Sequence, residues 1–353
     1  MQTFIFEGRS TRVVFGSGSL GQLPQELAHH GIQKALVLTT PEQVVLGQHI
    51  HSLLGDKSVG VHCGAVMHVP LESAREAVRI ARDLGADGCV AAGGGSTTGL
   101  AKAIALESSL PIIAVPTTYA GSEMTPLYGI TDGGVKKTGK DWRVMPRGVV
   151  YDPDLTLGLP LGISMTSGIN AVAHAVEALY APNRNPIGSL MAQEGIRAIL
   201  EALPKLYRNL QDAQARSDAL YGAWLCGSVL GQMQMGVHHK LCHTLGGSFN
   251  LPHAELHTVM LPYALAYNLD TTPQAQHAIG RVLNVQENIP QALQNYCAAL
   301  GMPTCLRDIG MPEDCLERAA DLAVQTPYPN PRPLERGPIR QLLQCAFEGS
   351  EPC

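Results

Sequence analysis

A helix that crosses a bilayer needs about 20 apolar residues in a row, and no stretch of this chain of 353 residues approaches that length. The amino-terminal stretch MQTFIFEGRSTRVVFGSG has no apolar core of the kind found in secretory signals. Basic residues are not clustered, and the formal net charge is −5, so nothing favours nucleic acids or membrane surfaces as partners. We therefore expect a soluble, cytoplasmic protein that binds neither nucleic acid nor membrane.

Charged residues are also scarce, at 16 % of the chain, whereas hydrophobic residues reach 45 %. This balance argues against disorder and is typical of a compact globular enzyme. Cysteine pairs with CxxC spacing are absent and the number of cysteines, nine, is odd, which argues against a disulfide framework or a thiolate metal cage. We expect reduced thiols at all of these positions: Cys63, Cys89, Cys226, Cys242, Cys297, Cys305, Cys315, Cys345 and Cys353.

The length and the periodicity of the sequence predict two domains. A single hydrophobic core usually stops growing at about 250–300 residues, which is fewer than this chain has. Residues 1–155 alternate short apolar runs with helical patterns, and so predict an α/β domain with a Rossmann-like parallel sheet. Residues 156–353 show helical periodicity without a series of strands, and predict an all-α domain. The clearest runs are KALVLTT (34–40), GCVAAGGGS (88–96) and PIIAVPTT (111–118) for strands, and ESAREAVRIARDLG (72–85) for a helix.

Two loops of the first domain are candidates for binding a nucleotide. GGGSTTGLAKAIAL (93–106) follows an apolar strand and begins a helix, where backbone N–H groups and the helix dipole can hold a pyrophosphate. Its spacing differs from the GxGxxG fingerprint. PTTYAGSEMT (116–125) follows another strand and offers hydroxyl and amide groups. Each loop alone is equally consistent with a tight turn, but two such loops favour a cofactor, with these candidate contacts: Gly94, Gly95, Ser96, Thr97, Thr117, Thr118, Tyr119 and Ser122.

Imidazole side chains are concentrated in GVHHKLCHTLGGSFNLPHAELH (236–257), which holds five of the thirteen histidines. A lone helical histidine is most often structural, whereas a converging set suits a divalent metal or proton transfer. Lys240 stands where the zinc-protease motif HExxH has Glu, which excludes that class. Residues four apart share one face of a helix, so the positions that can converge are Asn170 with His174, His239 with His243, and His253 in the following loop.

The order of motifs resembles that of the iron-containing (group III) alcohol dehydrogenase family along nearly the whole chain. The motifs are FGSGSLGQLPQEL, GGGSTTGLAKA, PTTYAGSEMTP, DPDLTLGLP, GINAVAHAVEALYA, HHKLCHTLGGSFNLPHAELHTVMLPY and NPRP. Within the family, the chain is similar to the branch of maleylacetate reductases in VMHVPLE (66–72), DWRVMPR (141–147) and NPRPLERGPIRQLLQCAFEG (330–349). The resemblance implies a homodimer and the NAD(P)H-dependent reduction of the C=C bond of maleylacetate to 3-oxoadipate, a step in the degradation of aromatic compounds.

The same resemblance implies the site residues. The family's metal ligands, an Asp and a His on one helix, a His on a second helix and a His in the next loop, correspond to Asn170, His174, His239 and His253. An Asn offers a neutral oxygen where an Asp offers a charged one, so we expect weak metal affinity and a reaction that does not require a metal. These residues and His243 are then expected to bind the dicarboxylate substrate and move protons. Arginines can also contact the substrate carboxylates, and the candidates are Arg143 and Arg332, with a structural role equally open for Arg332.

The expected cofactor is NADH, with NADPH tolerated. In the family, the strand that is ALVLTT here often ends in an Asp that binds the ribose 2′-hydroxyl, but in this chain it ends in Thr39 and Thr40. Without that carboxylate a 2′-phosphate is not repelled. The family's phosphate-loop Asp is replaced by Gly99. Two further nucleotide contacts are implied, Lys137, for which a solvated loop lysine is equally consistent, and Leu157.

Two rival functions remain from the sequence. A metal-dependent, NAD-linked alcohol or polyol dehydrogenase of the same family fits the motifs but is disfavoured by Asn170. A non-catalytic nucleotide-binding protein fits the general pattern but leaves the histidines without a role. For the reductase, we expect His243 to donate a proton, because it lies one helical turn from His239 and outside the ligand positions. His257 is expected to pack structurally.

Overall fold

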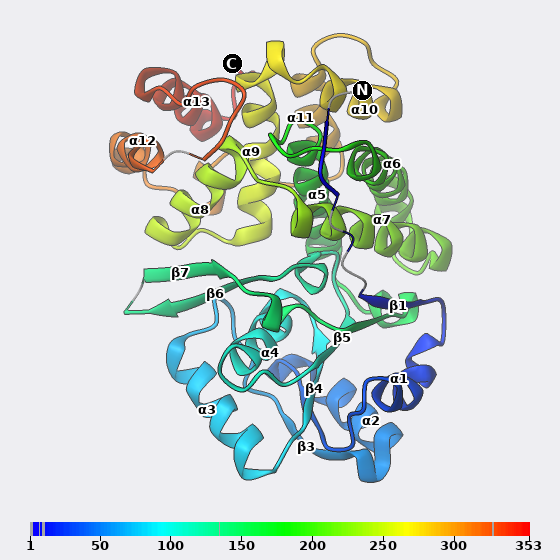
Figure 1. Cartoon of the computed structure of the whole chain (residues 1–353). Helices are drawn as coiled ribbons and strands as arrows, with labels where there is room; N and C mark the ends of the chain where they lie inside the picture. The colour runs from blue at the N-terminus through cyan, green and yellow to red at the C-terminus, as the bar shows by residue number, and fades with distance from the viewer. Residues whose placement is uncertain (1–2, 7, 9–10, 134, 327) are drawn as a thin grey trace. The chain divides into compact units, whose positions relative to one another are not determined.

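The computed structural model of the chain describes residues 3–6, 8, 11–133, 135–326 and 328–353. Its contacts divide the chain into two compact units, shown in Figure 1. The α/β unit extends to Leu159, and the helical unit comprises residues 160–353 together with the described residues 3–6. The division therefore falls four residues after the boundary expected from the sequence.

The α/β unit is built on a six-stranded sheet in the order β1-β8-β5-β4-β2-β3. Every neighbouring pair in this sheet is parallel. The strands are β1 (Arg12–Phe15), β2 (Ala35–Leu38), β3 (Ser58–His62), β4 (Gly88–Gly93), β5 (Ile112–Pro116) and β8 (Gly148–Tyr151), and the helices are α1 (Leu23–His29), α2 (Val44–Leu54), α3 (Leu71–Asp83) and α4 (Gly95–Ser108).

Apolar side chains cover both faces of this sheet, as expected when a parallel sheet lies between two layers of helices. Along β4, Cys89 and Ala91 belong to the core formed with α3 and α4. Val90 and Ala92 belong to the core formed with α1 and α2. Successive strand residues point to opposite faces, so a continuous apolar run such as GCVAAG is what a strand buried on both sides requires.

A two-stranded antiparallel hairpin was not predicted. It consists of β6 (Leu127–Asp132) and β7 (Val135–Lys140). Its sequence is polar and lysine-rich on the second strand, without the apolar run that indicated the other strands. Lys137 consequently lies on a strand and not in a loop.

The helical unit contains α5 (Leu161–Ala178), α6 (Pro186–Arg208), α7 (Ala213–Gln232), α8 (Val237–Phe249), α9 (His253–Tyr267), α10 (Pro273–Leu283), α11 (Ile289–Ala299), α12 (Leu316–Gln325) and α13 (Arg336–Glu348). The described residues of this unit form no strand. Helices α6 and α7 begin after Asn185 and Asp212, whose side chains accept backbone N–H bonds from the first turn. Helices α8, α9, α12 and α13 share one apolar core. Among the described residues, no helix combines the length and the apolar composition that crossing a membrane requires.

One disulfide contradicts the expectation that all nine cysteines are reduced. Cys345 on α13 is bonded to Cys353. The chain turns at Gly349, whose positive φ of 75° ends α13, and this reversal returns Cys353 to the helix it has just left. The spacing of eight residues did not match any pattern used for the sequence prediction. The other seven cysteines are free.

Candidate functional site

The α/β unit has its topological switch point at β2. The chain passes from β2 to β3 on one side and returns to β4 on the other side. In open α/β sheets, ligands bind beyond the carboxyl ends of the strands at such a point. Thr39 and Thr40 follow β2 directly, and Thr97 lies in the first turn of α4 after β4. The hydroxyl oxygens of Thr39 and Thr97 are buried without a hydrogen-bond partner among the described residues, as suits groups that contact a ligand.

The two loops predicted to bind the cofactor follow strands that are neighbours in the sheet, since β4 pairs with β5. A Cβ atom at Gly94 would lie 2.9 Å from Cγ2 of Thr118, so only glycine allows the loops to approach this closely. Gln43, in the loop after β2, donates a hydrogen bond to the Thr117 hydroxyl over 2.9 Å. Gln43 therefore joins the group, although nothing in the sequence singled it out.

Lys102 on α4 is a second residue that the sequence analysis missed. Its side chain is fully buried, and its ammonium donates hydrogen bonds of 2.7 Å to the carbonyl oxygens of Ser122 and Leu127 and of 2.9 Å to the Thr125 hydroxyl. Burial lowers the pKa of Lys102 to about 7, opposed by the nearby Glu123. These bonds attach the second cofactor loop to the helix that begins at the first.

The remaining predicted cofactor residues lie in the same unit. Tyr119 is buried, and Leu157 ends a 3₁₀ turn at Pro153–Thr156. Lys137 is exposed and forms an ion pair of 2.8 Å with Asp132 across its hairpin. A Cβ atom at Gly99, where the family has Asp, would lie 2.7 Å from Cγ2 of Val69.

Six histidines of the helical unit form one contiguous cluster. Ring centroids are 5.1 Å apart for His174 and His239, 5.9 Å for His239 and His243, and 5.0 Å for His239 and His257. His253 lies 4.4 Å from His257. His238 completes the cluster at 4.8 Å from His257. The structure thus brings together imidazoles from α5, α8 and α9.

Several polar atoms of this cluster are buried and unpartnered among the described residues: Asn170 Oδ1, His174 Nδ1, His239 Nε2, His238 Nδ1 and His257 Nε2. Imidazole nitrogens and an amide oxygen are ligands that a divalent transition metal accepts. The atoms at the family's ligand positions are therefore of a kind that can bind a divalent cation. What they lack is a carboxylate.

His253 differs from its prediction in one respect. It is the first residue of α9 and not part of a loop. Pro252 has a fixed φ that suits the residue preceding a helix, and its own ψ of 128° is extended. Because Pro breaks helical patterns in a sequence, the helix start immediately after it was read as loop.

The most deeply buried histidines are neutral. His238 and His257 are fully buried and are joined by a 2.9 Å hydrogen bond between Nε2 and Nδ1. Burial, with the neighbouring imidazoles, lowers the pKa of His238 to about 3 and that of His257 well below its ordinary value. In the described part of the chain, these two rings and Cys242 bring potential metal-ligand atoms within 4.8 Å of one another. The hydrogen bond already occupies the facing nitrogens of the pair.

His243 is exposed on α8. Its Nδ1 lies 3.1 Å from the hydroxyl of Tyr328. The Lys240 ammonium is 5.6 Å from the centre of the Tyr328 ring, a cation–π distance. Tyr328 is 85 residues from His243 in the chain, so no local sequence pattern could connect them.

The two candidate arginines make other contacts. Arg143 lies in the α/β unit and forms a bidentate pair with Asp141. Arg332 donates a hydrogen bond of 2.9 Å to the carbonyl oxygen of Tyr267 at the end of α9, and its guanidinium lies 4.2 Å from the centre of the Tyr267 ring. These contacts are of a structural kind, and a role of Arg332 toward the substrate stays a prediction.

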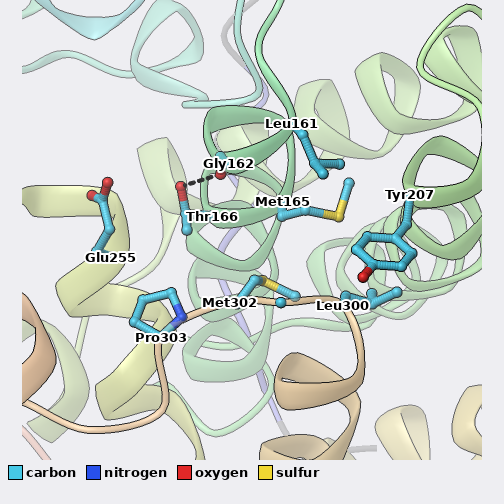
Figure 2. Close-up of a pocket in the computed structure, with 10 residues that line it drawn as sticks. Leu161, Gly162, Met165, Thr166, Tyr207, Glu255, Leu300, Met302 and Pro303 are labelled. Carbon is cyan, nitrogen blue, oxygen red and sulfur yellow. Dashed lines mark hydrogen bonds between the residues drawn. The ribbon is translucent and has the colours of Figure 1, made fainter.

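A cavity of about 340 Å³ lies in the helical unit and is lined by residues of α5, α6, α9 and the segment 300–303. Figure 2 shows Leu161, Met165, Tyr207 and Glu255 among its lining residues. Its single charged lining residue is an acid, so the lining offers no positive charge for a dicarboxylate.

A parallel sheet with two small polar loops near its switch point, and a helical unit with clustered imidazoles, are typical of a nicotinamide-dependent dehydrogenase. The comparisons with known proteins agree with that class. Residues 10–153 match the family model for iron-containing alcohol dehydrogenase, and residues 164–347 match the carboxy-terminal model of the Fe-containing alcohol dehydrogenase family. The chain belongs to the iron-containing alcohol dehydrogenase family.

Several of its relatives are maleylacetate reductases. The chain is 59 % identical to a maleylacetate reductase of Burkholderia cepacia and covers 100 % of both chains. It is 55 % identical to a maleylacetate reductase of Pseudomonas knackmussii, covering 99 % of both. The crystal structure of a maleylacetate reductase from a Rhizobium species superposes with a TM-score of 0.95 at 50 % identity and covers 100 % of both chains. The resemblance and the fold class expected from the sequence are confirmed, and the chain is an NAD-linked oxidoreductase.

Proposed function

We propose that this protein catalyses the NAD(P)H-dependent reduction of the C=C bond of maleylacetate to 3-oxoadipate in the degradation of aromatic compounds. The observation that carries the proposal is the 59 % identity, over the full length of both chains, to the maleylacetate reductase of Burkholderia cepacia. The histidine cluster with Asn170 in place of an acidic ligand supports it.

The substrate explains why clustered imidazoles suit this site. Its C=C bond is conjugated to a ketone, and the bound nicotinamide supplies the hydride that adds at the carbon β to that ketone. The electron pair of the C=C bond then moves to the ketone oxygen as an enolate. Imidazole N–H groups of the cluster stabilise this negative charge by hydrogen bonds.

His243 completes the reduction by delivering a proton to the carbon α to the ketone. Its imidazole is exposed, so it can exchange protons with solvent, and its Nδ1 is hydrogen-bonded to Tyr328. The bond to Tyr328 orients the ring. Each turnover consumes one hydride and one proton, and it leaves the C=C bond reduced and the ketone intact.

A metal is not required in this proposal. A divalent cation held by Asn170, His174, His239 and His253 would supply a Lewis acid to the substrate oxygen. Asn170 contributes no charge, which weakens such a cation's binding. The enolate of a conjugated ketone is also a more stable anion than an alkoxide, so N–H donors suffice for it.

The test is a substrate profile of the purified protein with and without a chelator. Oxidation of NADH in the presence of maleylacetate is expected to continue after iron and zinc have been removed, as verified by elemental analysis. Activity only with simple alcohols, and only with metal, would favour the alcohol dehydrogenase instead. If no substrate changes the nicotinamide absorbance, the result would favour a non-catalytic nucleotide-binding protein.

NADPH is proposed as a second, weaker cofactor. Thr40 follows β2 and carries no charge to repel a 2′-phosphate, and the sequence near it offers no arginine that would select one. The ratio of kcat/KM for NADH and NADPH tests this point. Thr40→Asp is expected to lower kcat/KM for NADPH alone.

A homodimer is also part of the proposal. The apolar side chains of Phe4, Ile5 and Phe6 are exposed, Ile5 by 82 %, and exposed apolar patches mark protein contacts. Light scattering should give twice the chain mass, and Ile5→Asp should reduce it. A cytoplasmic location belongs to the same proposal, since the reaction consumes a reduced nicotinamide.

A further inference from the structure

Glu177 is the most completely hydrogen-bonded acidic residue next to the histidine cluster. Its carboxylate is fully buried on α5. One oxygen accepts bonds from His239 Nδ1 over 2.6 Å and from the backbone N–H of Gly236 over 2.9 Å. The other accepts from the backbone N–H of His238 over 2.8 Å and from the Tyr180 hydroxyl over 3.1 Å.

These partners keep Glu177 ionised. Each carboxylate oxygen accepts a bond from a backbone N–H group, which can only donate, and the Tyr180 hydroxyl and the His239 ring complete the set, so the surroundings of the carboxylate suit its ionised form. The two backbone N–H groups belong to the amino-terminal end of α8, where the helix dipole also favours an anion.

An ionised carboxylate can only accept hydrogen bonds, and this fixes the proton on His239. Nδ1 must carry hydrogen to donate to Glu177. Nε2 is the remaining nitrogen, and it is buried without a partner among the described residues. Nε2 can therefore offer a lone pair to a cation or, when the ring holds a second proton, an N–H to a substrate oxygen.

Glu177 also shares a helix face with two of the family's ligand positions. Positions 170, 174 and 177 follow i, i+4, i+7 spacing and share one face of α5. The carboxylate is separated from the unpartnered Nε2 by the imidazole ring of His239. Carboxylates hydrogen-bonded to the far nitrogen of a functional histidine fix its tautomer and raise its basicity.

We infer that Glu177 is a positioning residue that holds His239 in the Nδ1-protonated form and places a negative charge behind its ring. The kinetic part of this inference rests on the proposed reductase function. The tautomer does not, because it depends only on the bond between the two side chains.

The experiment compares the wild type with Glu177→Gln and uses Tyr180→Phe as the matched control. Tyr180→Phe removes a neutral donor from the same carboxylate but leaves the bond to His239 in place. Two-bond ¹H–¹⁵N spectra of protein with ¹⁵N-labelled histidine report which ring nitrogens carry hydrogen, and His239→Gln identifies the signals of His239 by their loss.

The wild type and Tyr180→Phe are expected to show a protonated Nδ1 on His239. In Glu177→Gln that signal should shift toward a mixture of tautomers, and kcat for maleylacetate should fall by roughly 10–100-fold with little change in KM for NADH. An unprotonated Nδ1 in the wild type overturns the inference, and so does a Glu177→Gln variant with unchanged spectrum and kcat. If that variant does not fold, the wild-type spectrum decides alone.

A purely structural role for Glu177, as a cap of α8, makes a different prediction. In that case Glu177→Gln would lower the free energy of unfolding but would leave the His239 signals and the kcat of the folded fraction unchanged. A wild type that shows the expected tautomer but does not reduce maleylacetate contradicts the proposed function and leaves the role of Glu177 intact.

Discussion

The Nδ1 atom of His243 lies 3.1 Å from the hydroxyl oxygen of Tyr328. This bond joins α8 to a segment 85 residues further along the chain. An exposed imidazole held in this way has the access and the orientation that proton transfer needs.

Replacing His243 with Ala is expected to lower kcat by roughly 10²–10⁴ with little change in NADH affinity, because the group acts mainly in the transition state. Turnover and NADH binding of the purified variant check this. Tyr328→Phe keeps the ring and removes the orienting hydroxyl, so its kcat should fall less.

The matched control is His257→Ala. His257 is fully buried and hydrogen-bonded to His238, so its loss should destabilise the protein by about 2–4 kcal/mol through a cavity and an unpaired nitrogen. Its effect on kcat should be the smaller one. Near-normal turnover in His243→Ala together with lost turnover in His257→Ala would show that His243 is not the proton donor.

Asn170→Asp is expected to increase the affinity for Fe²⁺ or Zn²⁺ without being needed for maleylacetate reduction. A carboxylate restores the charge that the amide at this buried position lacks. Elemental analysis after dialysis against each metal measures the bound ion, with the wild type as reference. An unchanged metal content would show that the imidazoles around residue 170 do not converge on one ion.

Lys102→Met is expected to raise KM for NADH by roughly 10-fold while changing kcat much less, because Lys102 holds the loop that carries Ser122 and Thr125 and touches no reacting atom. Steady-state kinetics with NADH varied at saturating maleylacetate measures both constants. An exposed lysine, Lys34, provides the control as Lys34→Met. Equal KM values for NADH in the two variants would show that Lys102 does not support cofactor binding.

The same lysine predicts a pH dependence of stability. Burial lowers the pKa of Lys102 to about 7, whereas an unfolded chain has a lysine pKa of about 10.4. Between these pH values the unfolded state binds the extra proton, so the contribution of Lys102 to the free energy of unfolding rises as pH rises and is lowest below pH 7. Lys102→Met should therefore cost more stability at high pH, by about 2 kcal/mol between roughly pH 7 and 9.

Urea unfolding of the wild type and both lysine variants at the two pH values measures this difference. Lys34→Met should show no such trend, because its side chain is exposed in both states. A constant difference between wild type and Lys102→Met would mean that the ammonium keeps its proton throughout this range.

Local patterns were enough for the parts of the fold that depend on neighbouring residues. The run ALVL became β2, buried on both faces, and the four-residue spacing of His239 and His243 became one face of α8. The same spacing singled out Asn170 and His174, which lie on α5, and the ring of His174 is 5.1 Å from that of His239.

Contacts between distant segments could not be predicted in this way. Glu177 meets His239 across 62 positions, and Lys102 meets Leu127 across 25. Neither pairing has a signature in sequence spacing, because each depends on how two elements pack. Of these residues, only Glu177 could have been noticed from local spacing, since it continues the helix face of Asn170 and His174.

The close approach of Gly99 to Val69 has a consequence for substitutions at this site. A side chain added at residue 99 would collide with Cγ2 of Val69. Val69 itself has a left-handed φ of 49°, which a β-branched residue adopts only under constraint. Its carbonyl oxygen also accepts a bond from the N–H of Thr131, so Val69 cannot simply move aside. A change from Gly99 to an acidic residue would therefore have to be accompanied by a change at or around residue 69, so the two positions constrain each other's substitutions.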